Sequence, residues 1–568
     1  MKFRKNNHLL YLTVVSIFLV WFIVAFLIYP NINIVYHTFF ADGKFSIRAI
    51  EKIFTSARAV KGLKNSFLLA FTIMITSNIL GIFVVLVTEY FDIAGSRFLS
   101  VVYKIPMVFG GVVLANGYLF SYGANGFLTR MLREVFPQMD PYWFSGYLAV
   151  VFVMTFACTT NHLIFLRNAL MNIDYQTVEA ARNLGAGSFY ILRRVVFPVL
   201  KPVLLTCTIM LFQTGLMAVS APTMVGGRDF QTIGPMILTF SERTSSRDIA
   251  AVLSLILGIA EMALLYVSIR IERKGNYVSV SKVKTPLQKQ KITNRGINVV
   301  IHGLAYLLVV IYLLPLLAVV LFSFTDRYCI TNGEFDPARL TLKNYMEVLT
   351  DSAAYKPFLT SIIYSALSAL LVIVIVLICL RLILKYRNKA TALLEYLLHI
   401  PWFVPPVMFA LGMIITFDLP HWIMFNQPLV GTVFIMLIAY SVVMIPYTLR
   451  MLKSAFASFD TNLEDAAQNL GASGIRTFLQ IVLPCIMPVV LAVFAINFNG
   501  KLSDYDISAF IYHPLYPPLG VVIKNNVSNN IEGDAQALNL VYSVILMVIS
   551  STILYLVYGR NSKRKEDI

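Results

Sequence analysis

The side chains able to do acid–base, nucleophilic or metal chemistry are scattered along this chain rather than grouped. The five cysteines are odd in number and include no Cys-x-x-Cys pair, so neither a disulfide framework nor a zinc site is indicated. No His-Glu-x-x-His motif occurs, and the Gly-x-x-x-x-Gly-Lys-Ser/Thr loop that holds nucleotide phosphates is missing too. The sequence therefore predicts no catalytic residue, no metal site and no ATP hydrolysis by this chain, which is not an enzyme on its own.

Three carboxylates stand in or beside long apolar stretches, where a charge is costly and marks function by default. Glu261 lies more than two helical turns from the next charge, and Asp504 and Asp506 follow an apolar stretch closely. A negative charge there would attract a cation, most strongly where water is scarce. Each has a plainer alternative, which we favour: a protonated or hydrogen-bonded contact between helices for Glu261, and helix capping for the two aspartates. The three are our candidates for lining a solute pathway.

The most informative residues form a polar, helix-forming stretch that occurs twice. The first copy, Asp174–Pro202, reads DYQTVEAARNLGAGSFYILRRVVFPVLKP. The second, Asp460–Pro488, begins 286 residues later and reads DTNLEDAAQNLGASGIRTFLQIVLPCIMP. Both copies contain Ala-Ala-x-Asn-Leu-Gly-Ala and stand between apolar segments. A single copy would pass for an ordinary connector, but two copies in register indicate an internally duplicated fold.

The local chemistry of each copy predicts a helix, a sharp break and a second helix. Asp174 and Asp460 are suited to accept a backbone N–H bond at a helix N-terminus, and Thr461-x-x-Glu464 fits a capping box. Gly185 and Gly471 fit a helix end, where the left-handed conformation costs glycine little. We therefore expect a short docking helix in each copy, on one face of a membrane.

These stretches resemble the EAA loop of ABC importer permeases, whose pattern is Glu-Ala-Ala, three residues, Gly, nine residues and Ile-x-Leu-Pro. The second copy departs from that pattern at its first position, where an aspartate stands beside a glutamate. The residues that the resemblance assigns to ATPase coupling are Glu179, Ala180, Ala181 and Gly185 in the first copy, and Glu464, Asp465, Ala466, Ala467 and Gly471 in the second. With two loops in one chain, the sequence looks like the fused permeases of the ferric-iron, thiamine and phosphonate type.

The resemblance implies several partners. Each loop would dock into a groove on a separate cytoplasmic ABC ATPase, giving two ATPase copies, and an extracytoplasmic substrate-binding protein would deliver the solute. ATP would be bound by those partner subunits, and this chain would carry no cofactor of its own. Ferric iron is the first expectation for the solute, with thiamine, polyamines, phosphonates and sugar phosphates left open.

The composition of the chain indicates that membrane-spanning helices position these loops. The chain is 58% hydrophobic and 13% charged, with a mean hydropathy of +0.74, whereas soluble domains carry about 25% charged residues. We predict an all-α integral membrane protein with twelve spans of the length that a bilayer core requires. The predicted spans are 8–29, 63–87, 98–120, 146–166, 195–220 and 249–269 in the first half, and 299–324, 358–382, 393–417, 430–449, 481–498 and 537–558 in the second.

Six spans in each half give the halves the same orientation, so they are predicted to be parallel repeats. The first transmembrane domain would comprise residues 1–270 and the second residues 296–568, with a basic linker at 271–295. We expect the linker to be a flexible, solvated cytoplasmic tether rather than a regulatory contact. Prolines should bend or start helices, and Pro405-Pro406 is the strongest predicted break.

The net charge of +17 lies largely at the two termini and in the linker. That distribution follows the positive-inside rule for cytoplasmic helix flanks, and it favours anionic membrane lipid over nucleic acid as the partner. The basic residues between Lys44 and Lys61 disagree with the rule, but the loops and termini outweigh them. The predicted location is the bacterial cytoplasmic membrane, multi-pass, with both termini cytoplasmic.

Two segments after the fifth and eleventh spans are the predicted outer mouth of the pathway. The first holds Pro222-x-x-x-Gly226-Gly227, which is similar to the outer gate region of ferric-iron and polyamine-type permeases, and the second holds Asp504 and Asp506. The resulting hypothesis is the permease of a type I ABC importer that works by alternating access. Two rivals remain: a secondary transporter driven by an ion gradient, which would use Glu261, and a scaffold or sensor that moves no solute.

Overall fold

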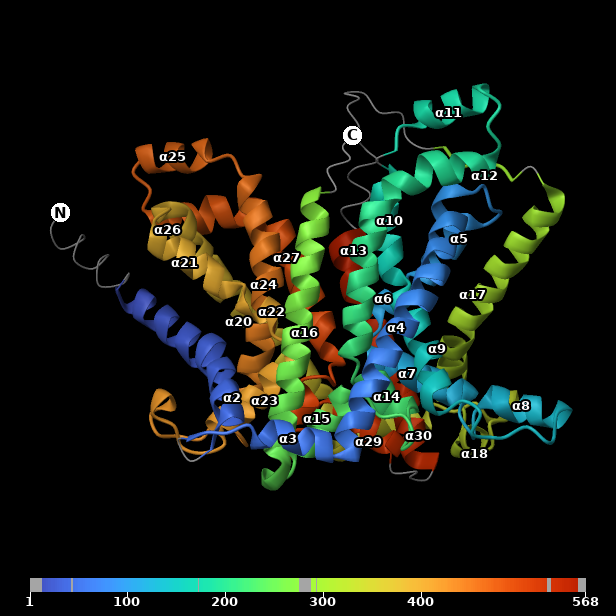
Figure 1. Ribbon diagram of the computed structural model, residues 1–568, viewed down its shortest axis with the longest axis horizontal. Coiled ribbons are helices and arrows are strands. Elements are labelled where there is room, and N and C mark those ends of the chain that lie inside the picture. Colours follow the sequence, from blue (N-terminus) through green and yellow to red (C-terminus); the bar gives the residue numbers. More distant parts are fainter. Residues whose placement is uncertain are drawn as a thin grey trace.

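The computed structural model describes residues 13–41, 44–171, 173–274, 288–292, 294–528 and 533–559, and helices make up most of it (Figure 1). The α-helices before the linker are α2 (Tyr29–Phe39), α3 (Arg48–Thr55), α4 (Ala57–Val85), α5 (Ser96–Tyr103), α6 (Ile105–Val108), α7 (Gly111–Tyr122), α8 (Phe127–Val135), α9 (Gly146–Cys158), α10 (Thr160–Met171), α11 (Tyr175–Asn183), α12 (Ser188–Ile191), α13 (Phe197–Leu216), α14 (Ser220–Val225), α15 (Ile233–Ser241) and α16 (Arg247–Lys274).

The α-helices after the linker are α17 (Arg295–Ser323), α18 (Arg327–Asn332), α19 (Lys343–Thr350), α20 (Ser352–Tyr386), α21 (Lys389–Leu398), α22 (Ile400–Phe403), α23 (Pro406–Phe417), α24 (Phe434–Ala457), α25 (Asn462–Asn469), α26 (Gly474–Thr477), α27 (Leu483–Leu502), α28 (Ser508–Ile511), α29 (Leu519–Ser528) and α30 (Gly533–Leu554). π-Helical turns are η1 (Ile23–Ile28), η2 (Leu86–Tyr90), η3 (Leu192–Val196), η7 (Phe478–Val482) and η8 (Tyr555–Gly559), and 3₁₀ turns are η4 (Thr244–Ser246), η5 (Pro337–Arg339) and η6 (Trp422–Met424). Two short strands, β1 (Phe40–Ala41) and β2 (Lys44–Phe45), pair antiparallel with Phe40 opposite Phe45.

The predicted all-α membrane fold is confirmed. Within the described ranges, ten continuous helical segments are long and apolar enough to cross a membrane, and two bent pairs bring the number to twelve. The predicted continuous spans at 98–120 and 393–417 are wrong in detail. Ser96–Val108 meets Gly111–Val135 at a bend of 112°, and Lys389–Phe403 meets Pro406–Phe417 at 104°.

The chain breaks at these two bends for related reasons. Val404 is extended (φ −112°, ψ 121°), as the residue before a proline prefers, and Pro405 and Pro406 cannot continue the hydrogen bonding of α22. In the first half, Phe109 is extended in the same way (φ −108°, ψ 135°) and precedes Gly110 and Gly111. The Pro405-Pro406 break predicted from the sequence is therefore confirmed, whereas its glycine counterpart was not predicted.

The two halves are repeats with one constant register from the docking loop to the last span. α12 and α26, η3 and η7, and α13 and α27 each begin and end 286 residues apart. One buried contact repeats as well: the Ile233 backbone N–H donates to Ser66 Oγ at 2.7 Å, and the Leu519 N–H donates to Ser361 Oγ at 2.8 Å. Both α11 and α25 lie at the same end of the molecule (Figure 1), so the halves are parallel, as predicted.

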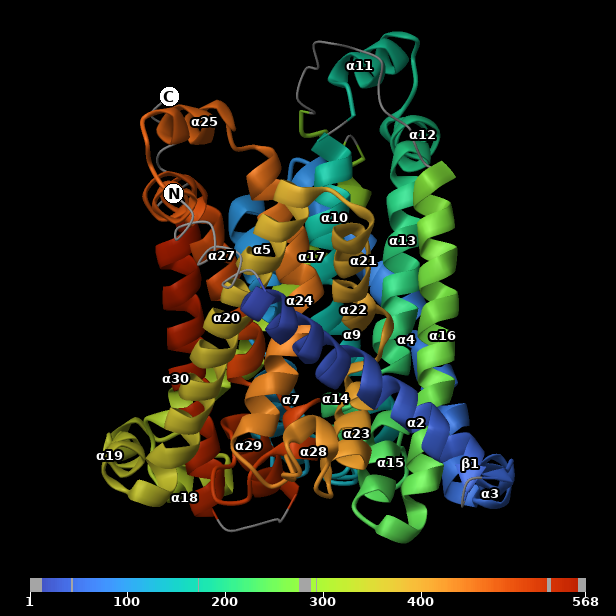
Figure 2. The ribbon, with the colours of Figure 1, turned by 90° about the vertical axis from the view of Figure 1, so that its left-hand side faces the viewer.

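The first helix of each half packs on the other half. The Thr13–Phe39 segment lies along the second half (Figure 2). There Trp21 Nε1 donates to the Ile423 carbonyl at 3.0 Å, and Asn33 Nδ2 donates to Thr416 Oγ1 at 3.0 Å. Conversely, α17 packs on α7, and Tyr103 of the first half donates to the Ala305 carbonyl at 2.7 Å. The halves are therefore interlocked at their first helices.

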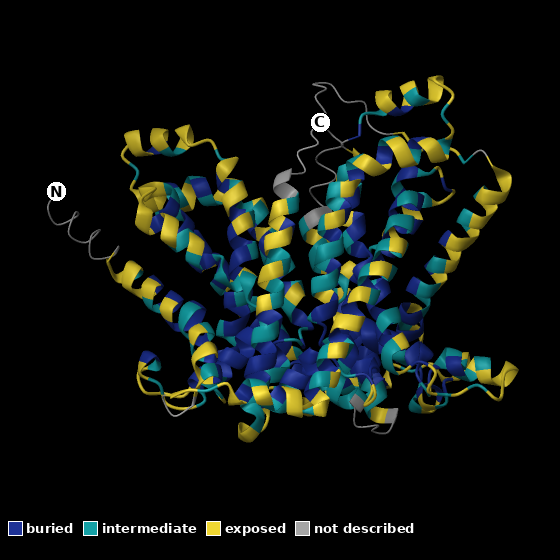
Figure 3. Cartoon of the chain, viewed as in Figure 1, coloured by how far each residue is buried: buried dark blue, intermediate teal, exposed yellow. Residues whose placement is uncertain are grey.

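Burial is uneven along the long axis of the helices. The parts of the two halves that carry α11 and α25 diverge, and many of their side chains are exposed (Figure 3). Buried residues gather toward the opposite end, where α7, α14, α15, α23 and α29 meet. We call the first the docking end and the second the outer end, after the roles that the sequence predicts for them. The halves are thus held together mainly at the outer end.

Candidate functional site

Each docking loop is built by the same backbone device. Asp174 Oδ1 accepts the Gln176 N–H at 3.1 Å, and Asp460 Oδ1 accepts the Asn462 N–H at 3.0 Å, which confirms both predicted caps. At the other end Gly185 (φ +84°) and Gly471 (φ +89°) are left-handed. The next amide in each loop bonds back five residues, at 3.1 Å in the first loop and 3.0 Å in the second. This closure is the Schellman motif, and it fixes the angle at which the chain leaves the docking helix.

The predicted Thr461-x-x-Glu464 capping box is wrong. Thr461 makes no side-chain cap bond, and the Glu464 side chain binds Arg381 of α20 instead of the Thr461 backbone. Arg381 Nη1 donates to Glu464 Oε2 at 3.0 Å, and Nη2 donates to Oε1 at 2.5 Å. These bonds hold the pKa of Glu464 below its ordinary value. Glu464 therefore anchors α25 to its own half, and its side chain is not a free contact for a partner.

The Ala-Ala pair has the same orientation in both loops, with the first alanine facing outward and the second facing this chain. Ala180 and Ala466 are exposed with Glu179 and Asp465, whereas Ala181 is half-buried and Ala467 is buried. The first residue of each pair is thus available to a partner and the second packs against this chain. The small size of both alanines permits close approach on both sides of the helix.

Sequence reasoning missed the largest exposed apolar groups of the loops. Leu184 is 88% exposed and Leu470 is 90% exposed, and they occupy equivalent positions one residue before the left-handed glycine. Phe189 and Ile475, also equivalent, are exposed as well. Isolated exposed apolar side chains are common, but here the same positions are exposed in both loops, which makes them candidates for contact with a partner. The sequence signal was available, because Leu-Gly occurs in both copies.

The segment just before α17 is attached to the first docking helix. Gln290 is 2% exposed; its N–H donates to the Tyr90 carbonyl at 2.8 Å, and its carbonyl accepts the Asp92 N–H at 3.0 Å. Its side-chain Oε1 accepts a bond from Arg182 Nη2 of α11. Lys289 Nζ donates to the Thr88 carbonyl at 2.8 Å. The expected solvated tether is therefore wrong for these residues, and linker residues 275–287 lie outside the described residues.

The outer end closes where the halves meet at equivalent positions. Ser220, at the start of α14, donates from Oγ to Asp506 Oδ1 at 2.5 Å, and these two residues stand 286 positions apart. Ser503 Oγ lies so close to Gly110 that a Cβ there would come within 1.9 Å of it. Burial raises the pKa of Asp506, and the neighbouring charge of Asp504 raises it further. We call Gly110, Ser220, Ser503 and Asp506 the gate cluster.

Asp504 is engaged in two local roles beside the gate cluster. Its Oδ1 accepts a bond from Lys501 Nζ at 2.9 Å. Its Oδ2 accepts the N–H groups of Ile507 at 3.2 Å and Ser508 at 3.1 Å. These bonds cap α28, as the plainer interpretation predicts, and leave Asp504 paired with a cation of its own chain.

Glu261 lies on α16, away from the two aspartates. Gly258, one turn earlier, faces Met408 and Pro405, so this part of α16 runs beside the break between α22 and α23. Glu261 Oε2 is buried and has no hydrogen-bond partner among the described residues. The equivalent residue in α30 is Met547, which is buried. The first half thus carries an intramembrane carboxylate that the second half lacks, at a place compatible with either of its predicted roles.

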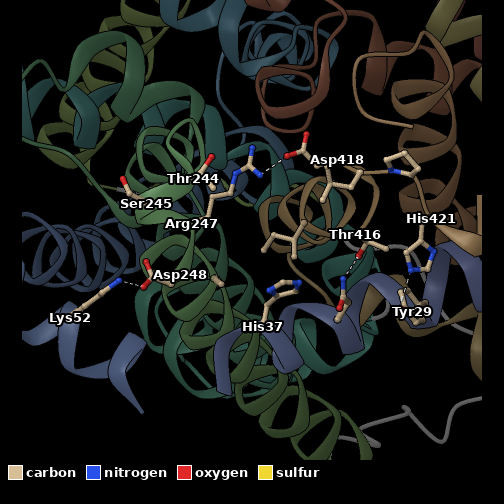
Figure 4. Close-up of a pocket in the computed structure, with 15 residues that line it drawn as sticks. Tyr29, His37, Lys52, Thr244, Ser245, Arg247, Asp248, Thr416, Asp418 and His421 are labelled. Atoms are coloured by element: carbon tan, nitrogen blue, oxygen red, sulfur yellow. Dashed lines mark hydrogen bonds and ion pairs between the residues drawn. The ribbon is translucent and has the colours of Figure 1, made fainter. Parts of the chain in front are cut away.

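A polar cavity of about 690 Å³ opens at the outer end between α2, α3, α16 and α23 (Figure 4). Arg247 Nη1 of the first half bonds to Asp418 Oδ2 of the second at 2.6 Å, and Lys52 pairs with Asp248. His421 Nε2 lies 3.2 Å from the Tyr29 hydroxyl, and burial lowers the pKa of His421. A counterpart of about 600 Å³ lies between α8 and the residues after α18, with Arg130, Arg133, Glu134 and Glu334 in its lining.

The amino-acid sequence is similar to those of a described protein family and of several individual proteins. The family described as "Binding-protein-dependent transport system inner membrane component" matches residues 63–272 and 379–566. The Probable ABC transporter permease protein y4fN of Sinorhizobium fredii is 35% identical over 95% of this chain and 94% of its own length. The ferric transport system permease protein FbpB of Actinobacillus pleuropneumoniae is 24% identical over 92% of this chain and 75% of its own length.

A solved structure of a bacterial ABC transporter involved in importing the acidic polysaccharide alginate also resembles part of this chain. It covers 48% of this chain and 98% of the solved one, at 16% identity and a TM-score of 0.39. The family match includes both docking loops and both last spans. The chain therefore belongs to the binding-protein-dependent transport system inner membrane components, and it is an ABC importer permease.

Proposed function

We propose that this permease docks two ATPase subunits through α11 and α25 and moves a solute between its halves by alternating access. The observation that carries the proposal is the pair of docking loops, which share caps, left-handed glycines and exposed leucines at one end of a duplicated fold. ATP binding would draw the ATPases together and move α11 and α25 with them. Rocking of the two halves would then open the gate cluster.

Contact of the halves at the outer end fits the inward-facing state of such a cycle. Opening must separate Ser220 from Asp506, so the closed gate is the arrangement described above. A substrate-loaded binding protein would dock on the outer surface. The two polar cavities beside α3 and α8 lie on that surface and are suited to accept its polar side chains. The differential affinity of ATP and of the binding protein for the two states would supply the energy for the transition.

Ferric iron delivered by a binding protein is the solute we propose, because some of the relatives that align over most of this chain are named ferric or Fe(3+) transport system permeases. In this scheme iron is cargo, and selection rests largely with the binding protein. Asp504 is already paired with Lys501, so of the three predicted pathway carboxylates we propose Glu261 and Asp506 as those that contact a cation. Uptake of radioactive iron by cells that express the permease with its ATPase and binding protein, compared with uptake of labelled thiamine and a phosphonate, would identify the solute.

The first experiment is a tagged purification in mild detergent with nucleotide present, followed by mass spectrometry of the proteins that accompany the permease. We expect a P-loop ATPase in about two copies and, under crosslinking, a binding protein whose ligand is the solute. Absence of any ATPase from a folded, nucleotide-supplemented preparation would refute the proposal. It would favour ion-gradient transport through Glu261.

Valine at Gly185 or Gly471 is expected to lower stimulated ATPase activity and uptake at least tenfold. Both glycines are left-handed with open space around them, so valine adds backbone strain of about 1–2 kcal/mol and a side chain where the ATPase must approach. Gly146 and Gly431 are matched controls, because they are also left-handed and unobstructed but lie at the outer end. Equal loss from valine at all four positions would indicate strain alone and contradict the docking role.

A further inference from the structure

Both docking helices are tied to the second span of their own half, but by different chemistry. In the second half Glu464 of α25 binds Arg381 of α20 directly, with two hydrogen bonds. The equivalent positions in the first half hold Val178, which is fully buried, and Leu86 of η2, so no ion pair can form there. The first docking helix therefore lacks the charged anchor of the second.

The segment between the halves lies where that anchor is missing. Gln290 forms a parallel bridge with Phe91, immediately after η2 at the end of the second span. Lys289 binds the Thr88 carbonyl of η2 and Ser96 Oγ of α5. The backbone of Gln290 is thus fixed to the end of the second span, while its side chain accepts a bond from Arg182 in the last turn of α11.

We propose that Gln290 is a positioning residue that links the first docking helix to the second span, in the role that Arg381 and Glu464 fill in the second half. The bond from the Arg182 guanidinium is charge-assisted, and such bonds are the stronger ones in proteins. Gln290 is almost fully shielded from water, so the loss of its side chain is not replaced freely by solvent. This inference rests on the proposed function only for its effect on transport.

The link also reaches the second half of the chain. Gln290 stands five residues before Arg295, where α17 begins, and α17 packs on α7 of the first half. Motion of α11 is therefore passed both to the second span of its own half and to the first helix of the other half. Within the described ranges, the ion pair of the second docking helix reaches α20, in its own half. The two ATPase positions are consequently unequal in this chain.

The test compares Gln290→Ala, Gln290→Glu and Gln288→Ala in the full chain, reconstituted with its ATPases and binding protein. Gln290→Ala removes both the acceptor for Arg182 and the Nε2 donor to the Gln288 carbonyl, whereas Gln290→Glu keeps the acceptor, adds an opposite charge and loses only that donor. Gln288→Ala makes the same truncation at an exposed position two residues earlier. Uptake per ATP hydrolysed and hydrogen exchange of the amides in α11 and α25 are measured for each variant, with Gly185→Val as the docking control.

We expect Gln290→Ala to speed exchange in α11 about tenfold with α25 unchanged, and to lower uptake per ATP threefold or more. Gln290→Glu and Gln288→Ala should behave like the unaltered protein. Unchanged exchange and coupling in Gln290→Ala, beside an inactive Gly185→Val, would overturn this inference and leave the proposed function intact. Equal losses in all three variants, or faster exchange without any change in coupling, would overturn it too. If Gly185→Val is fully active, the proposed docking fails, and α11 exchange still decides whether Gln290 holds the helix.

Discussion

Aspartate in place of both Leu184 and Leu470 is expected to weaken the binding of the two ATPases about 100-fold or more and to abolish uptake. Burying one leucine side chain contributes about 2 kcal/mol, which corresponds to about 30-fold in Kd. Aspartate at the same place adds the cost of taking a charge out of water. Both side chains project almost fully into solvent from equivalent places in the docking loops. Retention of each ATPase on the purified permease, measured by titration, would give the change directly.

The single variants sharpen this expectation, because each ATPase contacts one loop. Leu184→Asp should release one ATPase and Leu470→Asp the other, leaving complexes with a single ATPase. The control is Leu419→Asp, since Leu419 is 74% exposed but lies at the outer end. The same chemical change there should leave ATPase retention unaltered. Full retention in the Leu184/Leu470 double variant would show that these leucines do not form the docking contact.

Alanine at Ser220 is expected to raise ATPase activity in the absence of binding protein by tenfold or more. The bond from Ser220 to Asp506 joins the halves at the outer end, and a hydrogen bond to a charged group contributes about 1.5–3 kcal/mol. Its loss destabilises the closed gate by that amount and shifts the two-state equilibrium toward the open gate by about 10- to 150-fold. Basal ATPase activity in proteoliposomes and cysteine labelling from the outer side both report this shift.

The charge of Asp506 makes the same equilibrium depend on pH. Burial raises the pKa of Asp506 in the closed gate, so the closed gate binds a proton more readily than an open gate in which water reaches the carboxylate. Falling pH should therefore favour the closed gate and lower basal ATPase activity. Asp506→Asn should weaken this dependence. Basal activity that rises as the pH falls in the unaltered protein, or that stays low in Ser220→Ala, would contradict the role of the gate cluster.

Several features of the site were accessible from the sequence because they depend on local chemistry. The caps at Asp174 and Asp460 and the left-handed Gly185 and Gly471 follow from residue type and position within a few neighbours. The register of 286 residues between the copies also predicts which residues are equivalent. The break at Pro405-Pro406 was visible for the same reason, since proline acts on the backbone of its immediate neighbours.

The features that were missed depend on long-range contacts. The sequence near Glu464 fits a capping box. In the structure, however, the Glu464 carboxylate accepts two charge-assisted hydrogen bonds from Arg381, which stands 83 positions earlier. The need for glycine at position 110 comes from Ser503, almost 400 residues away, because a Cβ at 110 would collide with its Oγ. In the sequence, Gln290 is one of several polar residues in a basic linker. Only the structure shows its hydrogen bonds with Tyr90, Asp92 and Arg182. A single sequence contains no record of such distant partners.

The packing of each first helix on the opposite half has a consequence for biogenesis. Domains are generally completed in the order of synthesis, the N-terminal one first. Here Trp21 and Asn33 find their partners only when Ile423 and Thr416 have been made and inserted, about 390 residues later. The first half alone leaves that helix without its partners on α23 and η6, so this packing stays incomplete until the first three spans of the second half have entered the membrane. In a single continuous chain, each first half is always joined to one second half, which carries the surface on which its first helix packs. Two separately translated halves would first have to meet by diffusion in the membrane.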